Sequence, residues 1–110
     1  MIERTVIEYL QSHIEIPCYL EIPLKPPDRF VVLEKTGSSV SNLINTATIA
    51  IQSYGKTLAE TIDLNENIKE TMAGIINLDE IGGCHLNSDY NFTDTQTKKY
   101  RYQAVFDITY

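Results

Sequence analysis

The chain has 110 residues, of which 43% are hydrophobic and 22% are charged, and its formal net charge is −6 at pH 7. This length suits a single domain that folds without disulfides or metal, and the composition suggests neither a disordered nor a membrane-spanning class. The net charge argues against a generic nucleic-acid clamp, because phosphate binding needs clustered Lys and Arg and the nine basic residues are scattered.

The N-terminal segment, residues 1–13, has apolar side chains at intervals of three and four and polar side chains on the remaining face. This spacing predicts an amphipathic helix. Pro17 ends any helical continuation, and residues 18–22 then alternate as a short strand before three further prolines. Since proline cannot donate to a strand ladder, we expect this strand at an edge of the sheet.

Two further strands are predicted before the middle of the chain. Residues 30–33 form a compact β-branched run that residues 36–39 (TGSS) close, so we expect a loop over residues 36–43. Residues 44–54 alternate apolar side chains with β-compatible polar ones, which is typical of a strand. We expect this third strand to be central in the sheet.

A long helix follows at residues 57–77. Thr57 and Glu60 have the spacing of a capping box, in which the two side chains satisfy first-turn backbone donors. Apolar residues then recur at three- and four-residue intervals over about five turns. Asn65 interrupts this stripe where an apolar residue is expected, which predicts a bend or a polar contact at that position.

The last two strands complete the prediction. Residues 81–92 are predicted to be the fourth strand and residues 93–97 the turn that follows it. Residues 100–110 alternate apolar and polar side chains, which indicates a half-buried strand. We therefore predict one α+β domain, residues 1–110, with a mixed or antiparallel sheet of about five strands. Its order is helix, three strands, long helix, two strands, with the helices on one face.

The residues that commonly carry chemistry form no recognisable site. Cys18 and Cys84 are far apart and lack further ligands at metal spacing, so we expect free thiols in a reducing compartment. His13 and His85 complete no zinc motif. A pairing of Cys18 with His85 across the sheet stays open as a nucleophile and base, although a core thiol beside a surface histidine is favoured. The carboxylate pairs and glycines also fit no acid–base or phosphate-binding pattern.

Four segments carry a resemblance to a known family. They are residues 16–23 (IPCYLEIP), residues 30–37 (FVVLEKTG), residues 47–54 (ATIAIQSY) leading into a helix with Ala59, and residues 100–107 (YRYQAVFD). Their order along the chain is similar to that in the tail terminator, or head-tail joining (minor tail), proteins of long-tailed bacteriophages and prophages of Gram-positive bacteria. The resemblance spans nearly the whole chain.

The resemblance implies a structural virion protein with no enzymatic activity, cofactor, metal or membrane partner. It implies a homo-oligomeric ring, expected to be a hexamer, that caps the tail tube protein and docks to the head connector protein. DNA would be transiting cargo only, and an acidic channel wall would let it pass without sticking. The protein would lie in the tail or neck of the virion, and in the cytoplasm of the bacterial host during assembly.

Assembly contacts are expected where edges and loops are open to partners. These are the N-terminal helix, the edge strand and the predicted loop. The candidate contact residues are Tyr19, Glu21, Thr36, Gly37, Ser38, Ser39, Val40 and Asn42. One alternative is another neck or tail component, such as a tail tube protein or a head-closure adaptor. A second is a small ligand-binding domain or enzyme, which would have a deep pocket lined by convergent polar groups.

Overall fold

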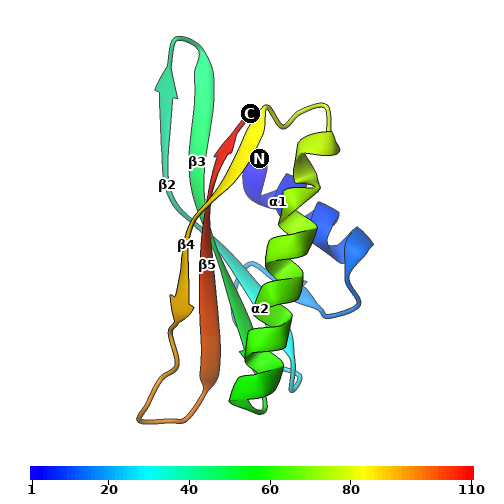
Figure 1. Cartoon of the computed structure of the whole chain (residues 1–110), viewed down its shortest axis with the longest axis vertical. Helices are drawn as coiled ribbons and strands as arrows, with labels where there is room; N and C mark the ends of the chain where they lie inside the picture. The colour runs from blue at the N-terminus through cyan, green and yellow to red at the C-terminus, as the bar shows by residue number, and fades with distance from the viewer.

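A computed structural model describes all 110 residues of the chain. Two α-helices pack on one face of a five-stranded sheet, whose strand order is β1-β2-β3-β5-β4 (Figure 1). The sheet is mixed, because β1 runs parallel to β2 and every other neighbouring pair is antiparallel. The predicted α+β fold class is therefore confirmed. The elements are α1 (Ile2–His13), β1 (Cys18–Tyr19), β2 (Phe30–Ser41), β3 (Ile44–Gly55), α2 (Leu58–Ala73), the 3-10 helix η1 (Ile75–Asn77), β4 (Gly83–Asn91) and β5 (Tyr100–Thr109).

The main core lies between the helices and the sheet and contains 19 buried residues. Strand β3 is central, as predicted, and alternate residues such as Ile49 and Ile51 are completely buried beneath the helices. Helix α1 buries the side chains that its spacing selects, including Val6 and Leu10. None of the helices has the length and apolar character that a membrane crossing requires.

Helix α2 begins with the predicted cap. The Glu60 amide donates to the Thr57 hydroxyl at 3.1 Å, and the Glu60 carboxylate accepts from the amide of Lys56, one residue before the cap, at 3.1 Å. The helix ends at Ala73, short of the predicted end, and η1 follows it. Gly74 lies at this break, and a Cβ there would stand 2.7 Å from the Tyr9 hydroxyl, so a side chain at this position would require the Tyr9 side chain of α1 to shift.

The buried stripe of α2 agrees with its apolar spacing in the second half of the helix, at Ile68 and Met72, and differs from it in the first turns. Leu58 is 38% exposed, whereas Leu64, Ile68 and Met72 are buried against the sheet, together with the polar Asn65. Of the two alternatives predicted at Asn65, a bend or a polar contact, the structure has the polar contact, since its amide donates to the Asp89 carboxylate of β4 at 2.9 Å. Tertiary packing selects the stripe that fits over the sheet, and the first turn projects beyond it.

Two strand predictions are corrected. Strand β1 contains only Cys18–Tyr19 rather than residues 18–22, although it lies at the predicted edge of the sheet. The predicted loop over residues 36–43 is wrong, because β2 continues to Ser41 and pairs with β3 up to a two-residue turn at Asn42 and Leu43. Cross-strand pairing with the β-compatible residues of β3 extends a segment whose own Ser and Gly content favours a turn.

Candidate assembly surface

The distal half of the β2–β3 hairpin projects past the body of the protein (Figure 1). From Glu34 to Ile44 every side chain is exposed, so this part of β2 contributes nothing to the core. The tip is nevertheless apolar: Val40 is 67% exposed, Leu43 is 95% exposed and Ile44 is 52% exposed. An exposed apolar cluster at the end of a projecting hairpin is a feature of contact surfaces.

The turn at the tip has an unfavourable residue in it. Asn42 and Leu43 both have positive φ, at 52° and 66°, which is the backbone of a type I′ hairpin turn. Asparagine tolerates this conformation, but leucine does not, and the left-handed region costs a residue with a side chain about 1–2 kcal/mol. Leu43 therefore lowers the stability of the isolated subunit without contributing to its core, which favours a role in contact with another molecule.

Replacing Leu43 by glycine is expected to raise the free energy of unfolding by about 1 kcal/mol, because glycine adopts positive φ without strain. Urea unfolding followed by circular dichroism measures the change. The matched control is Asn42→Gly, which should alter the stability by only a few tenths of a kcal/mol because asparagine already suits the turn. A loss of stability in Leu43→Gly would contradict the strained-turn interpretation.

Both outer edges of the sheet have unpaired backbone groups. Strand β1 covers β2 only at Val31 and Val32, so the β2 edge is open from Glu34 to Ser41. Strand β4 is the last strand on the opposite side and has no neighbour beyond it. An open strand edge is a template for pairing with another chain.

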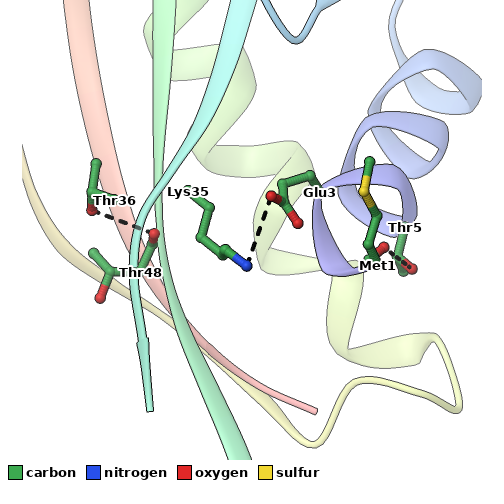
Figure 2. Close-up of polar contacts among 6 residues, drawn as sticks. All are labelled: Met1, Glu3, Thr5, Lys35, Thr36 and Thr48. Carbon is green, nitrogen blue, oxygen red and sulfur yellow. Dashed lines mark hydrogen bonds and ion pairs between the residues drawn. The ribbon is translucent and has the colours of Figure 1, made fainter.

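At the base of the projecting hairpin, one contact links it to α1 and a second joins its two strands (Figure 2). The Lys35 ammonium lies 3.8 Å from the carboxylate of Glu3 in α1. The Thr36 hydroxyl donates to the carbonyl of Thr48 at 3.4 Å, across a bulge that leaves Thr36 without a partner in the ladder. The bulge bends the strand where it leaves the core.

A row of stacked side chains crosses the sheet face that carries no helices. Phe30 and Tyr54 stack with ring centroids 4.4 Å apart, and the Arg101 guanidinium lies over the rings of Tyr54 and Phe92 and donates to the Tyr54 hydroxyl at 3.2 Å. Edge-on contacts with Tyr19 and with Tyr90 extend the row to β1 on one side and to the end of β4 on the other. The row is defined by Tyr19, Phe30, Tyr54, Arg101, Phe92 and Tyr90.

These rings cover one another, so the row mainly stabilises the fold. It leaves little aromatic surface for contact with a partner. Phe30 is 6% exposed and Tyr54 is 5% exposed although no helix lies over them. Only the rings of Tyr90 and Phe92, at the β4 end, remain 42% exposed. Tyr19, which the sequence proposes as an assembly contact, belongs to this row and packs on Phe30.

Two polar clusters tie β4 to the rest of the fold. The Asp89 carboxylate accepts from Asn65 and lies 3.0 Å from the Lys69 ammonium, which also pairs with Glu66 at 2.9 Å. Hydrogen bonds to Glu66 and to Asp89 raise the pKa of Lys69. On the opposite face, Asp107 accepts from Thr48 and Asn87, both at 3.0 Å. No group of three or more His, Cys, Asp or Glu side chains is placed to hold a metal ion.

The thiol and imidazole side chains are kept apart by the topology. Cys18 lies in β1 and His85 in β4, at opposite edges of the sheet, so the alternative that pairs them as nucleophile and base is wrong. Cys84 and His85 are neighbours in one strand and therefore point to opposite faces, as predicted. Both cysteines are free, and burial raises the pKa of each thiol to about 11.

Stability is expected to fall as the pH rises from 9 to 11. The pKa of Cys18 is raised from 9.0 to about 11 in the folded chain, so the unfolded state loses its thiol proton first and gains stability relative to the native state. One pKa unit corresponds to about 1.4 kcal/mol, so this thiol accounts for a loss of about 2–3 kcal/mol. The raised pKa values of Cys84 and Lys69 act in the same direction.

Urea unfolding at pH 8 and at pH 11 tests this pH dependence. The control is Cys18→Ala, which should be less stable than the native chain at pH 8 and should lose about 2 kcal/mol less on going to pH 11. An equal loss in both proteins would show that the Cys18 thiol does not drive the alkaline destabilisation.

The structure separates the sequence-predicted contact residues into two groups. Tyr19 and Glu21 lie at the β1 end of the β2 edge, whereas the candidates between Thr36 and Asn42 lie together on the projecting hairpin. Leu43 lies at the end of the segment predicted to make contacts but is not among the individual candidates, and sequence reasoning missed Ile44 and the open edge of β4. The Asn-Leu pair between two β-compatible runs was the available signal for the turn.

No family model matches this chain, and a search of curated proteins found no match.

Proposed function

We propose that the protein is a tail terminator, or head-tail joining, subunit that forms a ring on the head-proximal end of a phage or prophage tail tube. The proposal combines the resemblance of four segments of the sequence with one structural observation. The subunit has open strand edges on opposite sides of one sheet, and a hairpin with an apolar tip extends from one of them. A ring needs two different, complementary patches on each subunit, because its contacts are heterologous.

The surface pockets support a ligand-binding or enzymatic role less well than the strand edges support a ring. The largest has a volume of about 410 Å³ and is an open depression over Thr46, His85 and Asp107. Asp107 already accepts from Thr48 and Asn87, so its carboxylate is engaged in the fold. Deep enclosure with convergent free polar groups, which small-molecule sites need, does not occur there.

The experiment begins with light scattering and electron microscopy of the purified protein, alone and with the tail tube protein encoded in the same gene cluster. We expect rings, and tubes that stop growing once a ring occupies one end. A protein that stays monomeric with and without the tube protein would contradict the proposal. The charge of −6 adds a second expectation, an acidic channel wall, and a basic lumen would contradict it.

The same experiment distinguishes the neighbouring roles. A tail tube protein would polymerise into tubes without a second protein. A head-closure adaptor would bind the portal side of the neck and leave tube growth unchanged. Either result would replace the tail-terminator assignment with another virion component.

A further inference from the structure

We infer that neighbouring subunits join through their sheets, with the projecting part of β2 pairing antiparallel with β4 of a second copy of this chain. This inference rests on the proposed ring and specifies the two surfaces that meet. It also assigns the apolar hairpin tip to the neighbouring subunit. Three features of the structure carry it, namely the strand directions, the levels of the two open edges and the strained leucine at the tip.

The strand directions allow this contact. Strands β2 and β3 are antiparallel, as are β3 and β5, and β5 and β4, so β2 and β4 run in opposite directions. When two copies stand side by side in the same orientation, β2 of one therefore meets β4 of the next as an antiparallel pair. Antiparallel pairing is the more stable arrangement and tolerates a short contact. The contact is heterologous, as a ring requires.

The two open edges also lie at the same level of the sheet. Following the cross-strand partners through the sheet from Ser39 leads to Gly83, and from Gly37 to His85. The open part of β2 and the first residues of β4 therefore stand opposite each other when a second copy is placed beside the first without a shift along the strands. The partners in the first of these rows are Ser39, Thr46, Thr109 and Gly83.

Bulges limit how far the strands pair. The β2 register shifts between Lys35 and Gly37, and the β4 register shifts between Leu86 and Ser88. Bulges on edge strands restrict pairing with other chains, so the regular part of the contact lies on the tip side of both bulges. A few backbone hydrogen bonds orient the subunits, and apolar contact from the tip must supply the remaining binding energy.

The tip projects to the end of the molecule where apolar side chains of η1 and the C-terminus are exposed. Val40 and Leu43 lie past the level of Gly83, and Figure 1 places the hairpin tip at the same end as η1 and the C-terminus. Ile76 of η1 is 54% exposed and Tyr110 is 37% exposed. The tip of one copy thus extends toward this end of the next, which explains why a strained, almost fully exposed leucine is present there.

Disulfide cross-linking in the assembled protein tests the pairing, with the native Cys84 replaced by alanine in every variant because its thiol is free and lies on the β4 edge. In S39C/G83C the two thiols lie at the same level of the sheet. In S39C/H85C the second thiol lies two residues further along β4, on the same face as position 83. A Cβ at position 83 meets only Thr109, at 3.9 Å, so cysteine fits there. Cα atoms of antiparallel partners lie about 4.5–5.5 Å apart, within reach of a disulfide. The matched control is S39C/N91C, because Asn91 lies at the level of Val31, where β1 already covers β2.

Oxidation of S39C/G83C or S39C/H85C should give a ladder of covalent oligomers on a non-reducing gel. Oxidation of the control S39C/N91C should give none. Leu43→Gly, which is expected to fold more stably than the native chain, should weaken association by about ten- to a hundred-fold, as measured by analytical ultracentrifugation. Asn42→Gly should leave association unchanged.

The results separate this inference from the proposed function. Rings that cap tubes, but show no cross-link in either variant and are unaffected by Leu43→Gly, would overturn the inference and leave the tail-terminator function standing. Cross-linked oligomers that neither form rings nor bind the tube protein would support the edge contact and contradict the tail-terminator function. A ladder in the control as strong as in the test variants would overturn the inference.

Discussion

Replacing Tyr54 by alanine is expected to lower the free energy of unfolding by about 3–5 kcal/mol. The Tyr54 ring is 5% exposed, lies parallel to Phe30 and supports the Arg101 guanidinium, so its removal leaves a cavity at the centre of the stacked row. Stacked aromatic pairs contribute about 0.5–1.5 kcal/mol beyond their buried area. Chemical denaturation monitored by circular dichroism measures the loss.

The matched control is Tyr54→Phe, which keeps the ring and removes only the hydroxyl that accepts from Arg101 at 3.2 Å. This variant should lose about 1 kcal/mol, the contribution of one hydrogen bond. Equal losses in the two variants would show that the hydroxyl, rather than ring packing, stabilises this face. A negligible loss in Tyr54→Ala would show that the row is a surface feature without a structural role.

The second large effect is expected in α2. Replacing Ile68 by alanine should lower the free energy of unfolding by about 3 kcal/mol, within the usual range for a fully buried aliphatic side chain. Ile68 is completely buried between α2 and the sheet, in the same core as Ile49 and Phe106. Thermal or urea unfolding measures the change, which is a large part of the stability of a domain of this size.

Leu58→Ala is the control for this helix. The apolar spacing of α2 includes Leu58 in the predicted stripe, whereas the structure leaves the Leu58 side chain 38% exposed. We expect a loss of no more than about 0.5 kcal/mol, as for other partly exposed surface substitutions. A larger loss from Leu58→Ala than from Ile68→Ala would contradict the packing of the first turn, in which Leu58 projects beyond the sheet.

The projecting hairpin shows where sequence-based reasoning failed. Residues 36–39 contain glycine and serine, which locally favour a turn, and nothing in the neighbouring sequence reveals that β3 will pair with them. The actual turn, at Asn42 and Leu43, lacks the glycine that usually marks a two-residue hairpin. The candidates between Thr36 and Asn42 were selected for a loop, and the structure places them on a strand edge and its tip.

The sequence alone determined the features whose causes are local. Periodicity, proline positions and the capping box depend on residues a few positions apart, and they were sufficient for the α+β class, the helix α1, the central strand β3 and the start of α2. Only the tertiary structure decided which strand edges stay open, which side chains of the first turns of α2 are buried and how far β2 extends. It also brought Asn65 to Asp89 and Tyr54 to Arg101, since such partners are specified by strand pairing and packing between residues distant in the chain.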